Sequence, residues 1–129
     1  MNRDIKFRAK RRSFDIWTDF NLLNEINNDS EPSEFFQYNL NIDTIGQFTG
    51  FKDKNGVDIY EGDILELRKN TKYKVVFEKA SFYLYHINIK DWDGSQLRWG
   101  LLNRVYELSS EFTPNIIGNI FDNPELLTI

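Results

Sequence analysis

Short runs in which apolar and polar residues alternate make up most of this chain, and turn residues separate them. Ile5 to Lys10 alternates without a break, and segments 73–78 and 82–89 repeat the pattern with many aromatic side chains. This two-residue period is typical of strands with one buried face, and no stretch shows the 3.6-residue period of a long helix. The sequence therefore predicts a mostly β fold of roughly seven or eight short strands, arranged as a barrel or a sandwich.

Composition narrows the class of protein further. A chain of 129 residues favours one domain, and an aromatic content of 16% favours a core rich in rings. The chain has no cysteine, which excludes disulfides, thiolate nucleophiles and cysteine-bound zinc, and suits a cytoplasmic protein. No apolar run reaches the length of a signal-peptide core or a membrane-spanning helix, so we expect no membrane partner.

Turn residues are densest in the segment 49–64, TGFKDKNGVDIYEGDI. Its Asn55-Gly56 pair predicts a hairpin with a type I′ turn, because that turn needs a positive φ at both central residues. Residues 61–63 (Glu-Gly-Asp) predict a second tight bend. Near the C-terminus, Asn123 is placed to cap a single helical turn that begins at Pro124. Residues 24–34 hold few apolar side chains and predict an exposed loop.

The acidic residues of this segment are interpreted as turn residues rather than metal ligands. Asp53 and Asn55 can be aligned with two positions of an EF-hand loop. In that alignment, however, Phe51 and Gly62 occupy positions that need oxygen ligands. We therefore expect no metal site here.

Other catalytic and cofactor motifs are also poorly matched. Gly46 and Gly50 are spaced one residue too closely for a phosphate-binding P-loop, and Phe51 stands between the second glycine and the lysine. His86 is the only histidine, and no Gly-x-Ser-x-Gly motif accompanies it. We expect no cofactor and no catalytic residue, and hence a non-enzymatic protein.

Basic residues are concentrated at the N-terminus. Residues 1–12 carry six basic side chains and one acidic side chain, whereas the whole chain has a net charge of −4. Acidic proteins repel nucleic acid, but a basic strand can contact phosphate. The candidate nucleic-acid contacts are Lys6, Arg8, Lys10, Arg11 and Arg12. The alternative, which we favour, is that these residues are solvated side chains on an edge strand, where charge prevents aggregation.

Four blocks of the sequence resemble the YopX family of phage and prophage proteins. They are IKFRA at 5–9, GQFTGFKDKNGVDIYEGDIL at 46–65, VVFE at 75–78 and IIGNIFDNPELL at 116–127. Lys10 stands where the family pattern has Trp, and Phe51 stands where it has Leu. The resemblance implies a mainly β fold with a small barrel and a phage-encoded origin, and it implies no established activity.

The expected architecture is a mostly β YopX-like fold, with a short N-terminal β-hairpin region, a small SH3-like barrel and one C-terminal helical turn. It forms a single unit, with N-terminal strands and a loop at about 1–45 and a barrel core at about 46–129. The family motifs imply structural roles for Gly50, Asp53, Asn55, Gly56, Tyr60, Glu61, Gly62, Asp63, Gly118, Asn119, Asn123 and Pro124.

Three functions follow as hypotheses. The leading hypothesis is a protein-interaction or assembly module with an unknown protein partner. The alternative is a nucleic-acid-binding accessory protein that uses the basic N-terminal strand, and nucleic acid is the less favoured partner. The second alternative is a carboxylate-dependent enzyme that uses Asp58, Glu61 and Asp63.

We also expect a homo-oligomer. The first strand has an apolar row, Ile5, Phe7 and Ala9, and a strand near a chain terminus often forms the edge of a sheet, where unpaired backbone groups recruit a second copy. The basic row on the opposite face of this strand opposes such pairing, because identical charges repel each other.

Overall fold

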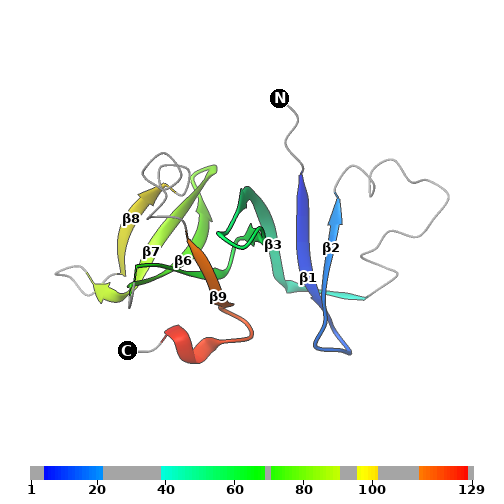
Figure 1. Ribbon diagram of the computed structural model, residues 1–129. Coiled ribbons are helices and arrows are strands. Elements are labelled where there is room, and N and C mark those ends of the chain that lie inside the picture. Colours follow the sequence, from blue (N-terminus) through cyan, green and yellow to red (C-terminus); the bar gives the residue numbers. More distant parts are fainter. Residues whose placement is uncertain (1–4, 22–38, 69–70, 91–95, 102–113, 128–129) are drawn as a thin grey trace. The chain divides into compact units, whose positions relative to one another are not determined.

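The computed structural model describes residues 5–21, 39–68, 71–90, 96–101 and 114–127, and the predicted loop at 24–34 lies outside them. The chain divides into two compact units, Met1–Gly50 and Phe51–Ile129. The described residues are mostly strand, and one 3-10 helix, η2 (Pro124–Leu127), follows the last strand (Figure 1). Among these residues, no helix is long and apolar enough to cross a membrane. The predicted mostly β class is confirmed.

The N-terminal unit is built from β1 (Lys6–Arg11), β2 (Trp17–Asn21) and most of β3 (Leu40–Lys52). Both neighbours of β1 run antiparallel to it, and Phe7 lies opposite Phe20 on β2. The two rings stack with their centroids 5.8 Å apart. A small core of Ala9, Phe20 and Leu40 forms on this face, with Phe7 and Ile45 packed against it. Phe7 and Ala9 of the apolar row predicted for the first strand therefore belong to a core, whereas Ile5 is exposed.

The strand order corrects the predicted position of β1. The order is β2-β1-β3-β4, so β1 is an internal strand and not a sheet edge. Figure 1 shows β1 between β2 and β3. The prediction was wrong because β3, which is distant in sequence, pairs with the side of β1 that does not contact β2. The edge-strand interpretation of the basic row therefore fails, and so does the edge-pairing argument for self-association.

A bulge in β3 shapes the end of the same sheet. The pairing of β1 with β3 shifts register between Arg8 and Lys10. Within the bulge, Thr44 Oγ1 accepts a hydrogen bond from Lys10 N at 2.9 Å and donates one to Asn41 O at 2.7 Å. Asp43 N donates to Asn41 Oδ1 at 3.1 Å. Side chains thus satisfy backbone groups that the interrupted ladder leaves unpaired.

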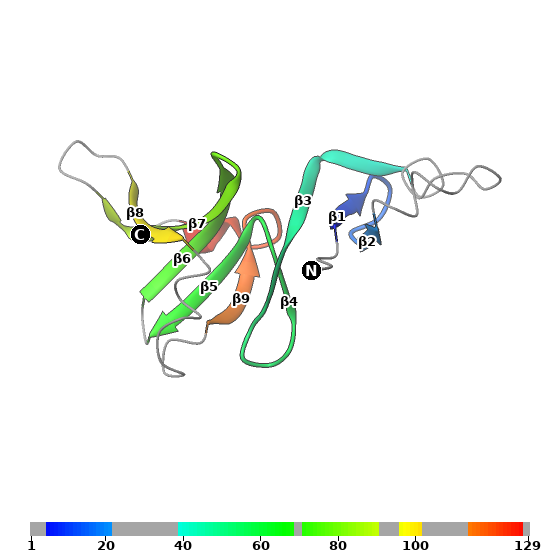
Figure 2. The same ribbon diagram turned by 90° about the horizontal axis from the view of Figure 1, so that it is seen from above.

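The C-terminal unit holds the remaining strands. Its sheet has five strands in the order β8-β7-β6-β5-β9, and β9 pairs with β5 from the far end of the chain (Figure 2). The strands of this unit are β4 (Asp58–Tyr60), β5 (Asp63–Arg68), β6 (Thr71–Glu78), β7 (Ser81–Lys90), β8 (Gln96–Leu101) and β9 (Asn115–Asn119). Ile59 of β4 is fully buried in one cluster with Leu65 of β5, Val75 of β6 and Leu84 of β7. The hairpin that contains β4 therefore packs against one face of the five-stranded sheet.

The strands predicted from alternation are confirmed at β1, β6 and β7. Residues 13–20 are rich in aromatic side chains, as a strand would be, but β2 begins only at Trp17. β7 is an internal strand of its sheet, with β6 and β8 as neighbours. The described pairings leave β8 and β9 at the ends of this sheet, so the small SH3-like barrel stays a prediction.

The turn type predicted for Asn55-Gly56 is wrong. Of the two residues, only Gly56 has a positive φ, at 81°, and the connection is closed by a hydrogen bond from Asp53 N to Val57 O at 2.8 Å. A two-residue turn with positive φ at both positions occurs instead between β6 and β7, at Lys79 (50°) and Ala80 (61°). This is the type I′ geometry, formed here without the usual Asn or Gly.

Candidate functional site

Asp53, the first acidic residue of the segment 49–64, accepts hydrogen bonds from the backbone of its turn. Asp53 is buried, and its Oδ1 accepts hydrogen bonds from Asn55 N at 2.8 Å and Val57 N at 2.9 Å. Its Oδ2 accepts a third from Ile116 N at 3.2 Å. One carboxylate therefore closes the turn and connects it to β9. This arrangement favours a turn other than type I′, because Oδ1 accepts from two backbone donors of the loop.

The second acidic bend is built in a similar way. Asp63 is 1% exposed, and its Oδ2 accepts a hydrogen bond from Tyr60 N at 2.8 Å. Gly62 has a φ of 93°, a left-handed conformation that favours glycine. Its N–H donates to Val75 O at 2.9 Å, and its carbonyl accepts from Ile120 N at 2.9 Å. The bend after Glu61 thus connects β5 to β6 and to the end of β9.

The third motif forms the turn after β9. Asn119 Oδ1 accepts hydrogen bonds from Phe121 N and Asp122 N, at 3.0 and 2.9 Å. Asn123 does not use its side chain to cap η2. Instead its Oδ1 accepts from Asn119 N at 3.2 Å, while its backbone carbonyl accepts from Leu126 N at 3.0 Å. A Cβ at Gly118 would lie 2.5 Å from Asn123 Oδ1, so this turn requires glycine there.

These contacts describe what the acidic cluster does. The carboxylates of Asp53 and Asp63 are engaged by backbone N–H groups, and Asp58 Oδ1 forms an ion pair with Lys52 Nζ at 2.7 Å. Within the described ranges, no group of three or more His, Asp or Glu residues is placed to hold a metal ion. The predicted roles of these residues in turns therefore have a direct structural basis.

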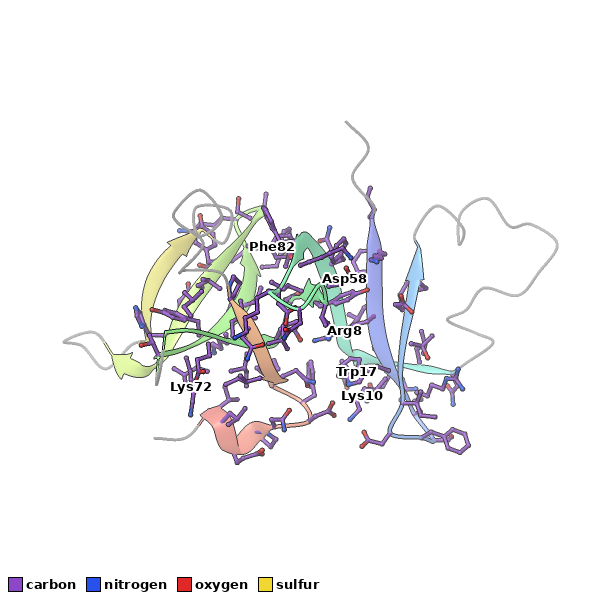
Figure 3. All side chains as sticks on the ribbon, viewed as in Figure 1. Arg8, Lys10, Trp17, Asp58, Lys72 and Phe82 are labelled. Carbon is purple, nitrogen blue, oxygen red and sulfur yellow. The ribbon has the colours of Figure 1, made fainter. Side chains whose placement is uncertain are left out.

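The basic residues of β1 lie largely against aromatic rings. Lys6 Nζ is 4.5 Å from the centroid of the Phe48 ring, and Arg8 Cζ is 4.6 Å from that of Trp17. Lys10 Nζ is 5.6 Å from the same Trp17 ring and forms an ion pair with Asp15. Figure 3 shows Arg8, Lys10 and Trp17 close together. Contacts of this kind cover the rings and hold the cations in place.

Three of the five candidate nucleic-acid contacts meet at the tip of the β1–β2 hairpin. Lys10, Arg11 and Arg12 line a shallow pocket of about 310 Å³ together with Ser13, Phe14, Asp15 and Asn41. Lys6 and Arg8 are not part of it. We call this surface the hairpin-tip pocket. Its lining is polar apart from the Phe14 ring, and three basic and one acidic side chains give it a net charge of +2.

Hydrogen bonds fix the walls of the hairpin-tip pocket relative to each other. Arg11 N donates to Ile16 O at 3.0 Å and closes the hairpin, and Arg11 Nε donates to Thr18 Oγ1 at 3.1 Å. Arg12 N donates to Asn39 O at 3.0 Å, which connects the hairpin to the start of β3. The pocket therefore lies on a scaffold that is already ordered before any ligand arrives.

His86, the only histidine, lies in the C-terminal unit and faces its core. It is 8% exposed, and its ring centroid is 4.5 Å from that of Tyr73. Burial lowers the pKa of His86 below its ordinary value of 6.5, because the charged imidazolium loses solvation. The neutral ring is therefore favoured, and it packs as an aromatic side chain.

The comparisons identify the family. The YopX protein family model matches residues 4–128. The chain belongs to the YopX family. The crystal structure of protein EF1440 from Enterococcus faecalis is similar to this chain, with 24% sequence identity and a TM-score of 0.57. That similarity covers 98% of this chain and 100% of the other, and it shows a shared fold. No curated protein matches this chain.

In this YopX chain, the sequence blocks that resemble the family coincide with structural connections. The block 46–65 contains the Asp53 turn and the bend at Gly62, and the block 116–127 contains the turn after β9. The block 5–9 lies in the internal strand β1. The family resemblance thus rests on residues that build the fold.

Sequence reasoning missed Phe14 and Asn41 as members of the hairpin-tip pocket. Phe14 and Ile16 continue the alternation of a strand, so the loop that holds them was not predicted. Asn41 begins a run, Asn-Ile-Asp-Thr, whose side chains are typical of turns, and this run was the available signal for the bulge in β3.

Proposed function

We propose that this YopX protein is a phage-encoded, cytoplasmic accessory protein that acts by binding nucleic acid through the tip of its β1–β2 hairpin. The observation that carries the proposal is the hairpin-tip pocket, which Lys10, Arg11 and Arg12 line together with the exposed ring of Phe14. Basic side chains beside an exposed ring suit a ligand with phosphates and flat bases. The absence of cysteine supports the proposed cytoplasmic location.

The internal position of β1 supports this choice over the protein-interaction module favoured by sequence. An edge strand can use lysines and arginines simply to prevent aggregation, but β1 has strands on both sides. The basic tip therefore needs another explanation. The net charge of −4 opposes binding at a distance, so we expect weak binding that depends strongly on salt.

We further propose that the protein acts without catalysis. Support comes from Asp53 and Asp63, whose carboxylates accept backbone hydrogen bonds inside turns. Each of these two carboxylates therefore has a structural role in its turn. Asp58, another of the three candidates (Asp58, Glu61 and Asp63), pairs with Lys52.

Fluorescence polarisation with labelled single-stranded and duplex DNA tests the binding proposal. Arg11→Gln/Arg12→Gln should weaken binding about tenfold at low salt, and should reduce the slope of log K against log salt by about 0.7 for each phosphate contact that is lost on a single strand. The matched control is Lys54→Gln/Lys79→Gln, which removes two exposed charges from the C-terminal unit. An unchanged polarisation at low salt with wild-type protein would refute the proposal.

A protein-interaction module remains the second candidate, because apolar side chains surround the same tip. Phe14, Ile16 and Ile42 are 63%, 46% and 58% exposed. Exposed apolar groups next to arginines are common at protein interfaces. A second copy is the simplest partner, and Ile42→Ser should then lower the mass measured by analytical ultracentrifugation. A wild-type mass fixed at 15.4 kDa over all concentrations would exclude the second copy.

A further inference from the structure

Phe14 is the most exposed large apolar side chain of the described residues, at 63%. It lies in the loop between Arg11 and Trp17, beside the exposed Arg12. Loops of hairpins are usually polar, and an aromatic ring there adds nothing to the small core on the other face of β1. Both its position and its exposure suit a ring that packs against a ligand.

Asn41 adds a side-chain hydrogen-bond donor to the lining of the pocket. Asp43 N–H donates to the side chain of Asn41 at 3.1 Å, so the atom that faces Asp43 is Oδ1. The Nδ2 group is then the donor that remains, and Asn41 lines the hairpin-tip pocket. Acceptor atoms on the edge of a nucleobase suit such a donor.

The charged side chains are distributed unevenly over the pocket, and this orients a bound nucleotide. Asp15 is beside Lys10 and its side chain is 84% exposed, so that end of the pocket repels phosphate. Arg11 and Arg12 are the other two basic side chains of the lining. A phosphate is therefore attracted to the arginine end, while the ring of Phe14 and the amide of Asn41 are left for a base.

We propose that the hairpin-tip pocket binds one nucleotide of a single-stranded nucleic acid, with its base stacked on Phe14 and its phosphate at Arg11 and Arg12. This inference rests on the proposed function and names the form of nucleic acid. Bases within a duplex stack on each other and offer no open face, whereas a single strand offers a face at every base. Since every base has such a face, the binding tolerates different sequences.

The test compares a labelled oligothymidylate of about ten nucleotides with a blunt duplex of the same length. Phe14→Ser should weaken binding of the single strand on the order of tenfold to a hundredfold. The slope of log K against log salt should stay as in wild type, because the ring carries no charge. Phe14→Trp, which keeps a stacking surface, should retain the affinity. Phe77→Ser is the control for loss of an exposed ring in the other unit, and it should bind like wild type.

The outcomes separate this inference from the proposed function. If the single strand and the duplex bind equally and Phe14→Ser leaves both unchanged, stacking is refuted, while an effect of Arg11→Gln/Arg12→Gln would still support nucleic-acid binding. If Phe14→Ser weakens both ligands equally, or Phe14→Trp fails to restore binding, the ring has no stacking role. If wild-type protein binds neither ligand at low salt, both proposals fail.

Discussion

Replacing Asp53 tests whether the acidic segment 49–64 builds the fold. Its carboxylate accepts three backbone hydrogen bonds, from Asn55 N, Val57 N and Ile116 N. Hydrogen bonds to a charged acceptor contribute about 1.5–3 kcal/mol each. Asn55 and Val57 are exposed, so water can replace part of their loss. We therefore expect Asp53→Ala to lower the free energy of unfolding by about 3 kcal/mol, well below the sum of three full bonds.

Asp53→Asn refines the same prediction. The amide keeps an oxygen that can accept from Asn55 N and Val57 N, but its NH₂ group then faces Ile116 N–H, and two donors oppose each other. The expected loss is about 1–2 kcal/mol, between wild type and alanine. Asp58→Ala is the control, because it removes a single ion pair with a largely exposed lysine and should cost under about 1 kcal/mol.

Urea denaturation followed by circular dichroism measures these differences in the free energy of unfolding. The comparison requires that the slope of this free energy against urea concentration is the same for all variants. If Asp53→Ala were within about 0.5 kcal/mol of wild type, the three hydrogen bonds would not stabilise the fold as argued. A stable Asp58→Ala protein that had lost a measured activity would instead support the enzyme alternative.

Three further predictions concern stability. Gly118→Ala should destabilise the protein by about 2 kcal/mol, because the new Cβ meets the Asn123 side chain. The same substitution should cost much less when Asn123 is also replaced by alanine. A double-mutant cycle measured by urea denaturation tests this, and additive effects of the two substitutions would contradict it. Ala80→Gly should raise the free energy of unfolding by about 1 kcal/mol, because it removes the strain of a positive φ, and a lower melting temperature would argue against it. Because the pKa of His86 is lowered in the folded protein, its contribution to stability is complete above pH 6.5 and declines as the pH falls through the folded pKa. His86→Gln should remove that decline from the urea midpoints measured just below pH 6.5, and an identical decline would rule out His86 as its source.

Local patterns in the sequence predicted the strands and the positions of the bends. β1, β6 and β7 alternate because one face of each is buried, and this holds whatever their partners are. Glycines 56 and 62 both have positive φ, as expected of residues in tight turns. These features depend on neighbours within a few residues, so one sequence is enough to predict them.

Features that depend on distant residues were not predicted. The internal position of β1 results from its pairing with β3, more than thirty positions away in the register Lys10–Asn41. The turn at Gly56 depends on Ile116 N, which binds the same carboxylate. The positive φ values of Lys79 and Ala80 arise because the register of β6 and β7 leaves only two residues for the connection. In each case a tertiary contact overrides the local preference.

The fold and the proposed binding surface should respond to different substitutions. Asp53, Asp63 and Asn119 each bond backbone groups in turns of the C-terminal unit, so changes there should alter the free energy of unfolding. Phe14 is exposed on a hairpin loop and lies outside the core of Ala9, Phe20 and Leu40, so its loss should leave stability nearly unchanged. A variant of Phe14 that unfolds as readily as a variant of Asp53 would mean that the ring supports the N-terminal unit. The hairpin-tip pocket would then be a structural feature and not a binding site.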